Sequence, residues 1–148
     1  MPRGFQDVHL EIQSTVDQLD HVQEVADQVA RTLGMDEDTL HWTTMAVRES
    51  VINAIAHGNK HDASKRVLID FSATPPDNPE ILIVSVRDQG DGFNPETVHD
   101  PLSPENVLKA SGRGIFLIKC FMDEVVIQPA KGGGTEMRMK KRLRPHAE

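Results

Sequence analysis

Residues 48–60 read RESVINAIAHGNK, an apolar helical segment that carries two polar side chains four residues apart. The apolar positions that predict the helix are Val47, Val51, Ile52, Ala54 and Ile55. Glu49 and Asn53 interrupt this pattern, although Asn is a mediocre helix former that competes for its own backbone's hydrogen bonds. Positions i and i+4 lie on one helix face, so both side chains can converge on one pocket. A well-packed helix does not need them, which makes them candidate site residues.

The composition indicates one globular domain over residues 1–148. The chain is 38% hydrophobic, and 148 residues suffice for a single core. Its longest apolar runs, at 81–84 and 115–118, are far too short to cross a bilayer. The N-terminus has no apolar stretch of the kind found in a secretory signal, so we expect a cytoplasmic protein without a membrane segment.

The net charge and the cysteine content argue against two kinds of function. A net charge of -7 argues against nucleic acid as a direct partner, because phosphate binding requires a basic surface. The basic run at 140–144 is interpreted as an edge strand that leads into a charged tail at 141–148. The single cysteine, Cys120, cannot close an intrachain disulfide, and its apolar neighbours predict a small buried hydrophobe rather than a nucleophile.

The first half of the chain predicts one strand followed by two helices. Apolar and polar residues alternate in residues 7–13, as in a half-buried strand. From Val16 the apolar positions recur at helical spacing, with Ser14 or Thr15 as the N-cap and Gly34 as the stop. A second helix begins at the acidic residues 36–38, whose charges suit a helix N-terminus, and continues through the opening segment to Gly58.

The second half returns to strands. Residues 66–74 and 81–88 flank the sequence PPDNP and predict an antiparallel hairpin. A polar connection from Gln89 to Ser111 is long enough to be functional or mobile. A short helix at 114–121 and two strands joined by a glycine-rich turn complete an α+β fold with helices on one face of a sheet.

Three glycine-bearing segments accompany the opening one: RDQGDGF, SGRGIFLI and KGGGT. Gly112 and Gly114 would let the backbone approach a phosphate at a helix N-terminus, although an ordinary helix-entry turn gives the same pattern. Asp88 ends an apolar strand, where a carboxylate serves either as a cap or as the acceptor for a ligand's exocyclic amine. Gly90 and Gly92, which open space beside it, favour the ligand.

The segments ESVINAIAHG, DQGDGF, SGRGIFLI and GGGT resemble the N, G1, G2 and G3 boxes of the GHKL ATP-binding superfamily, which includes gyrase, histidine kinases and a heat-shock chaperone. The chain's size, the ExxxN form of the N box and the phrase FMDEV further resemble the stand-alone anti-sigma-factor serine kinases of bacteria. The resemblance spans Val8 to Leu143. It implies a two-layer α+β sandwich with a mixed, mostly antiparallel sheet of four to five strands, about three helices on one face and a flexible ATP lid at 93–111.

The resemblance assigns roles to the residues of the first two boxes. Glu49 is expected to be the general base that takes the proton from a substrate hydroxyl. Asn53 is expected to bind the Mg²⁺ that bridges the ATP phosphates, which suits a metal that keeps much of its hydration. The family places Asp88 against the adenine amino group, and Gly90 and Gly92 in the base-binding turn.

The remaining boxes supply further expected contacts. Gly112, Arg113 and Gly114 would meet the phosphates, and the Thr135 hydroxyl would support the adenine end of the pocket. His57 matches the family pattern NAxxHG, but a histidine that satisfies local carbonyls at a helix end is at least as good an interpretation. With His61 it forms an i, i+4 pair, which we do not interpret as a zinc site because the sequence nearby offers too few further ligands.

Two classes of function follow from the resemblance. The first is an ATP-dependent serine/threonine-protein kinase that phosphorylates a STAS-type anti-anti-sigma protein and sequesters a sigma factor in a partner-switching circuit, as a homodimer. The second is an ATP-binding anti-sigma or regulatory module without phosphoryl transfer. Glu49 favours the kinase, because binding alone needs no base. Ala110 slightly favours the module, because kinases of this family carry a basic residue directly before the Ser-Gly of the lid.

Other nucleotide chemistries fit the sequence less well. A third possibility is an ATP-hydrolysing fragment of a larger machine. We expect a chain that is complete from its first to its last strand, and this expectation argues against a fragment. The P-loop pattern GxxxxGK[ST] and the dinucleotide fingerprint GxGxxG do not occur in the chain. The motif set of eukaryotic-type protein kinases is also missing.

Overall fold

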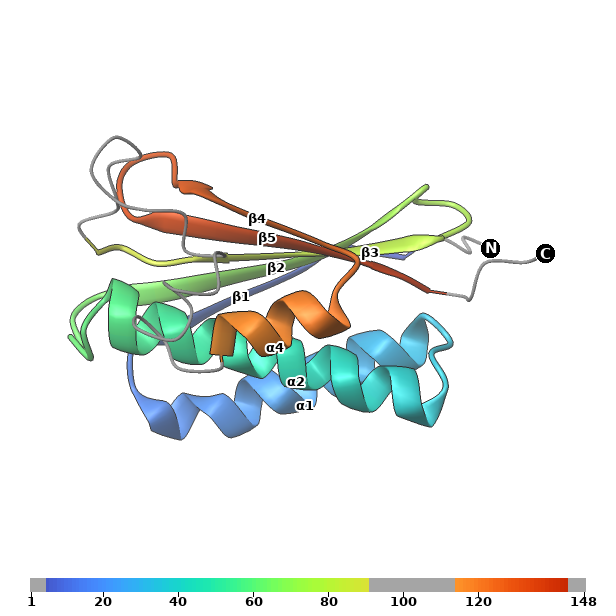
Figure 1. The fold of residues 1–148 in the computed structure, drawn as a ribbon, viewed down its shortest axis with the longest axis horizontal. Helices are drawn as coiled ribbons and strands as arrows, with labels where there is room; N and C mark the ends of the chain where they lie inside the picture. Colours follow the sequence, from blue (N-terminus) through green and yellow to red (C-terminus); the bar gives the residue numbers. More distant parts are fainter. Residues whose placement is uncertain (1–4, 91–113, 144–148) are drawn as a thin grey trace.

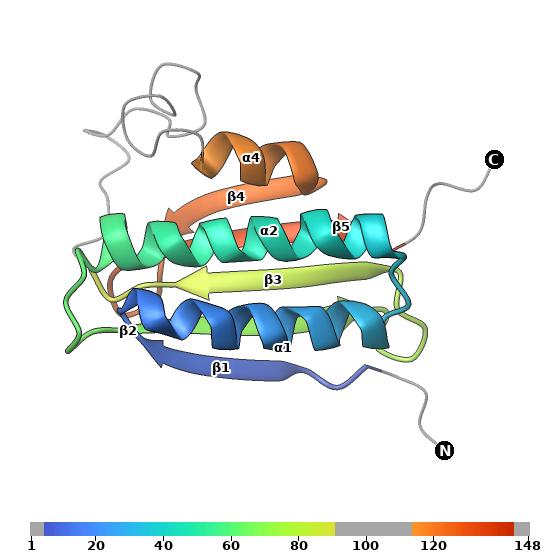
Figure 2. The ribbon, with the colours of Figure 1, turned by 90° about the horizontal axis from the view of Figure 1, so that it is seen from below.

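The computed structural model describes residues 5–90 and 114–143. In this part of the chain, five strands form one sheet, and three α-helices cover one of its faces (Figures 1 and 2). The elements are β1 (Val8–Gln13), η1 (Val16–Gln18), α1 (Leu19–Thr32), α2 (Glu37–Asn53), η2 (Ala54–Gly58), β2 (Arg66–Thr74), β3 (Ile81–Arg87), α4 (Gly114–Phe121), β4 (Glu124–Pro129) and β5 (Thr135–Arg142). The predicted two-layer α+β fold is confirmed.

The strand order in the sheet is β1-β2-β3-β5-β4, and every neighbouring pair is antiparallel. The hairpin predicted around PPDNP is the β2–β3 pair, in which Phe71 lies opposite Val84. Val84 in turn lies opposite Met139 of β5. Because side chains alternate across a strand, this row faces the helices, and all three residues are buried.

The core lies between the sheet and the helices. Its largest fully buried apolar side chains, each less than 2% exposed, are Phe71, Ile55, Ile69, Leu82, Ile118, Met139, Val22, Val47, Val51, Val67 and Val84. They come from β2, β3, β5 and all three helices, so the removal of this apolar surface from water stabilises both layers together.

The second helix begins as predicted and ends in an unexpected way. The Asp36 side chain caps it by accepting a hydrogen bond from the Thr39 backbone N–H at 2.7 Å, which lowers the pKa of Asp36. After Asn53 the helix widens into the π-helical turn η2, in which the Asn59 N–H donates to the Ala54 carbonyl at 2.8 Å. The sequence pattern predicted the length to Gly58 but not the wider turn, a feature that is frequent at functional sites.

Three local predictions were wrong. The strand that contains the start of the basic run is not an edge strand, because β5 lies between β3 and β4 in the sheet. Neither Ser14 nor Thr15 caps the first helix with its side chain: Thr15 makes no such bond, and the fully buried Ser14 hydroxyl donates to the Lys65 carbonyl at 2.8 Å. Cys120 is exposed rather than buried. The core positions of α4 are Ile115 and Ile118, followed by Met122, and the helical spacing turns residue 120 away from them.

Some expectations lie outside the described residues. The lid predicted at 93–111 lies there, as does most of the basic tail, because only residues 141–143 of it are described and they belong to the end of β5 and the residue after it. Among the helices that are described, none has both the length and the apolar character needed to cross a membrane.

Candidate functional site

Helix α2 carries the first part of the site. Glu49 and Asn53 are both half-buried on it, and α2 lies between α1 and α4 (Figure 2). The Asn53 amide nitrogen is buried and has no hydrogen-bond partner within the described residues. A buried donor that stays unsatisfied costs about 1–3 kcal/mol, so this amide is suited to an acceptor supplied by a ligand.

Asp88 forms the second part of the site, directly after β3. Its side chain is only 7% exposed, and its Oδ1 accepts hydrogen bonds from the backbone N–H groups of Gly90, at 3.0 Å, and Thr135, at 3.1 Å. Burial raises the pKa of Asp88, and these two hydrogen bonds oppose the increase. No donor among the described residues contacts Oδ2, so that oxygen can accept a hydrogen bond from an amine.

Three glycines bring the backbone close to Asp88. A Cβ atom on Gly58 would lie less than 3.0 Å from three atoms of the Asp88 side chain. A Cβ on Gly90 would overlap the Gly58 carbonyl, and one on Gly134 would overlap the Asp88 carbonyl. Gly134 also has a φ of +87°, which L side chains rarely adopt. The packing at this turn therefore requires glycine at all three positions.

Thr135 is held at the same place through its backbone. Its N–H donates to the Asp88 carboxylate and its carbonyl accepts from the Asp88 N–H at 3.0 Å, so the last strand starts directly beside the end of β3. The KGGGT segment is thus joined to the RDQG segment, although the two are more than 40 residues apart in the sequence.

Of the other predicted site residues, two belong to the described part of the chain and three do not. His57 is exposed on η2. Gly114 is the first residue of α4, which begins beside the C-terminal half of α2 (Figures 1 and 2). Gly92, Gly112 and Arg113 lie outside the described residues.

Sequence reasoning missed two of the three glycines. The sequence places Gly58 at the end of the N-box helix and Gly134 in the turn of the G3 box and indicates a contact for neither, but both pack against Asp88. Their one signal in the sequence is position: Gly58 closes the HG of the N box, and Gly134 directly precedes Thr135.

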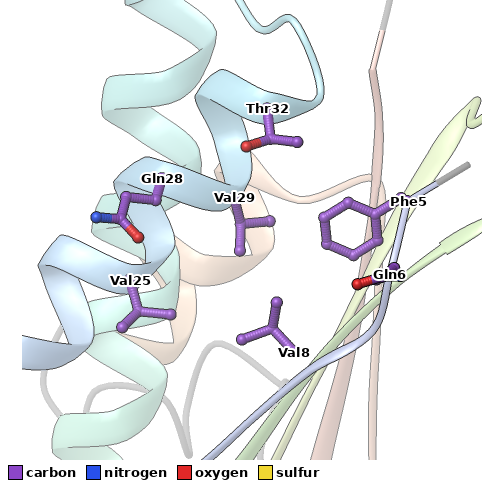
Figure 3. Close-up of a pocket in the computed structure, with 7 residues that line it drawn as sticks. All are labelled: Phe5, Gln6, Val8, Val25, Gln28, Val29 and Thr32. Atoms are coloured by element: carbon purple, nitrogen blue, oxygen red, sulfur yellow. The ribbon is translucent and has the colours of Figure 1, made fainter. Parts of the chain in front are cut away.

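An apolar pocket elsewhere does not belong to this site. It lies between α1 and the beginning of β1, where Val25 and Val29 of the helix point toward Phe5 and Val8 (Figure 3). The Asp88 turn lies beside the other end of the sheet's strands, since Gln89 is linked through Asn59 to Ser14, directly after β1.

The family comparison covers the candidate site. The family model of the histidine kinase-like ATPase domain matches residues 12–141, which include α2, the Asp88 turn and nearly all of the last strand. The chain belongs to this family. A histidine kinase-like ATPase domain binds ATP, and two features fit this ligand: an acceptor oxygen on Asp88 for the adenine amine, and a buried donor on Asn53 for a phosphate oxygen.

Named relatives of this ATPase domain agree with the resemblance found in the motifs. The chain is 37% identical over 102 residues to an anti-sigma F factor of Clostridium perfringens, which covers 66% of this chain and 69% of that protein. It is 34% identical over 113 residues to the serine-protein kinase RsbW of Bacillus licheniformis, covering 70% of this chain and 66% of that protein. The resemblance to anti-sigma-factor kinases is thereby confirmed.

Solved structures share the fold. A Mycobacterium tuberculosis structure of RsbU and RsbW domains has a TM-score of 0.66 and 19% identity over 95% of this chain, which spans only 34% of that longer chain. The mycobacterial sensor histidine kinase MprB has a TM-score of 0.54 and 18% identity over 94% of this chain and 100% of its own.

The packing of Gly58 gives a first prediction for this ATPase domain. We expect Gly58→Ala to weaken ATP binding about tenfold or more, because the new methyl group displaces the Asp88 carboxyl from its place. Isothermal titration calorimetry with ATP measures the effect. Gly132→Ala is the control: its Cβ meets nothing within 4 Å, but its φ of +87° strains the turn, so it should lower thermal stability and keep ATP affinity. Equal ATP affinity in Gly58→Ala and the wild type would contradict the contact assigned between Asp88 and ATP.

Proposed function

We propose that this protein is an ATP-dependent serine/threonine-protein kinase that phosphorylates a STAS-type anti-anti-sigma protein and sequesters a sigma factor. The observation that carries the proposal is the pair on α2: Glu49, a carboxylate that nucleotide binding alone does not need, lies one turn before Asn53, whose buried amide nitrogen has no partner among the residues that the structure describes. Support also comes from relatives named anti-sigma F factor and serine-protein kinase RsbW. The runner-up, a regulatory module that binds ATP without phosphoryl transfer, is favoured only by Ala110 in the lid sequence.

In the proposed mechanism, each residue has one task. Asp88 Oδ2 accepts a hydrogen bond from the adenine amine and so selects and orients the nucleotide. The Asn53 side-chain oxygen would hold Mg²⁺, and its N–H would donate to a phosphate oxygen. When bound, Mg²⁺ neutralises the charge that develops on the phosphates. Because phosphoryl transfer depends chiefly on positioning and charge stabilisation, this small set of side chains is sufficient.

Glu49 would act on the protein substrate. It takes the proton from the substrate serine hydroxyl as that oxygen forms a bond to the γ-phosphorus. The bond between the γ-phosphorus and the bridging oxygen breaks at the same stage, and ADP leaves with that oxygen. General-base catalysis of this kind contributes about 10²- to 10⁴-fold to a rate.

The proposal is tested by incubating the protein with γ-labelled ATP and the partners it retains from a lysate of its native host. We expect a small serine-bearing protein to be labelled in the presence of Mg²⁺ and not after addition of a chelator, and a sigma factor to be retained in the same pull-down. Retention of these partners and binding of ATP with no label transfer would instead establish the regulatory module. Recovery of neither partner would reject the partner-switching role.

We also propose that the protein forms a homodimer in the cytoplasm, where a sigma factor acts. Light scattering of the purified protein measures its mass directly, and a monomeric mass at micromolar concentration would reject the dimer.

A further inference from the structure

Asn59 directly follows the glycine that packs against Asp88, and it is 1% exposed. All of its side-chain hydrogen-bonding groups have protein partners. Its amide nitrogen donates to the Ser14 hydroxyl at 2.6 Å and to the Arg66 carbonyl at 3.0 Å. Its amide oxygen accepts from the backbone N–H of Gln89 at 2.8 Å. A buried amide that is fully satisfied in this way fixes the groups around it.

These three bonds join segments that are distant in the sequence. Ser14 follows β1, Arg66 begins β2, and Gln89 lies two residues after the end of β3. Two further bonds reinforce the connection: the Ser14 hydroxyl donates to the Lys65 carbonyl at 2.8 Å, and the Arg66 N–H donates to the Gln89 side-chain oxygen at 2.7 Å. One side chain at the end of η2 thus holds the same end of three neighbouring strands.

Gln89 is the residue between Asp88 and Gly90. On either side of it, Asp88 packs against Gly58, and Gly90 packs against the Gly58 carbonyl. Asn59 and Gln89 therefore form a hydrogen bond directly next to this close contact of two backbone segments. That bond keeps the Asp88 turn and the end of η2 at a fixed separation, since neither segment can move away without leaving a buried polar group unpaired.

We propose that Asn59 is a positioning residue for nucleotide recognition: by holding Gln89, it fixes the Asp88 carboxylate in the orientation that selects a 6-amino purine. This inference rests on the proposed ATP site. Asn59 itself does not contact the nucleotide, because its own polar atoms are used by Ser14, Arg66 and Gln89. Its contribution is pre-organisation, which lowers the cost of ordering the acceptor when ATP binds.

The test compares ATP with inosine triphosphate, which carries an oxo group in place of the 6-amino group. We expect Asn59→Ala to weaken ATP binding about tenfold or more and to reduce the preference for ATP over inosine triphosphate by a similar factor. The rate of phosphoryl transfer at saturating ATP should stay within about twofold of the wild-type rate. Glu49 and Asn53, which are assigned to that step, lie on α2, whereas Asn59 follows η2.

Two further variants make the test specific. Ser14→Ala removes one partner of the Asn59 amide and should produce a smaller loss in the same direction, about threefold; it carries the test if Asn59→Ala does not fold. Gln89→Ala is the matched control. It loses a side-chain bond of 2.7 Å to the Arg66 N–H but keeps the backbone bond to Asn59, so its preference for ATP should remain that of the wild type.

A readout without nucleotide separates this inference from the proposed function. Amide hydrogen exchange of the free protein should show faster exchange at the Gln89 N–H in Asn59→Ala, whether or not the wild type binds ATP. Unchanged exchange there would overturn the positioning role. A parallel loss of affinity for both triphosphates, with the preference unchanged, would also overturn it, since that is the result of a merely structural role. Failure of the wild type to bind ATP would reject the proposed function instead.

Discussion

Replacement of Glu49 by Gln is expected to slow phosphoryl transfer by about 100- to 10,000-fold. Gln has nearly the same shape as Glu and can keep its place on the half-buried face of α2, but it cannot take a proton from a serine hydroxyl. Affinity for ATP should remain within about twofold, because the contacts assigned to the nucleotide belong to Asn53 and Asp88. The rate of label transfer at saturating ATP measures the first effect, and calorimetry measures the second.

The matched control is Glu24→Gln, which removes a carboxylate from the exposed face of α1. It should leave both transfer and ATP binding unchanged. Transfer by Glu49→Gln at the wild-type rate would show that another group accepts the proton. Loss of ATP affinity in the same variant would place Glu49 among the nucleotide contacts instead.

Replacement of Asp88 by Asn should weaken ATP binding about 100-fold while preserving or raising thermal stability at neutral pH. The Asn oxygen can still accept the hydrogen bonds from Gly90 and Thr135. The Asn NH₂ group then replaces the Asp88 Oδ2 atom that would accept a hydrogen bond from the adenine amine. Two hydrogen-bond donors therefore face each other. The fold loses no backbone bond, and a buried charge is removed.

The pH dependence of the wild type follows from the raised pKa of Asp88. The folded protein holds the Asp88 proton more tightly than the unfolded chain does. This group's contribution to the free energy of unfolding therefore falls as pH rises from the ordinary carboxyl pKa, about 3.9, toward the raised pKa. ATP needs the ionised form, so wild-type affinity should fall as pH decreases through the raised pKa. Asp88→Asn should lack both dependences.

Calorimetry with ATP and thermal unfolding across acidic to neutral pH measure these effects. Asp70→Asn is the control: this carboxylate pairs with His9 and Arg87 in the β1–β2–β3 part of the sheet and its side chain is 40% exposed, so its loss should leave ATP affinity unchanged at every pH where the fold is intact. Equal ATP affinity in Asp88→Asn and the wild type would remove Asp88 from the adenine site.

The sequence was informative wherever a signal is local. Residues 66–74 and 81–88, which flank the sequence PPDNP, predicted a hairpin, and the structure contains it as β2 and β3. The acidic residues at 36–38 predicted a helix start, which Asp36 caps. Period and capping depend on neighbours within a few residues, so they can be determined without knowledge of the rest of the fold.

Local signals failed where the outcome depended on packing against a distant segment. Cys120 lies in an apolar run, but the direction in which a short helix faces its core is set by the sheet beneath it. Ser14 is a residue type that favours the N-cap position, yet its hydroxyl donates a hydrogen bond to the carbonyl of Lys65, more than 50 residues later. A helical period also does not distinguish an α-turn from the π-turn at Ala54–Gly58.

The sequence by itself therefore determined the elements, their order, the four boxes, and the polar pair Glu49 and Asn53 on one helix face. Only the tertiary structure decided that Gly58, Gly90 and Gly134 close around Asp88, and that Asn59 holds the turn beside it. The physical reason is that spacing along a chain specifies which side chains share a face of one element. Which backbone segments touch, and which buried groups complete each other's hydrogen bonds, is specified only when the separate elements pack together.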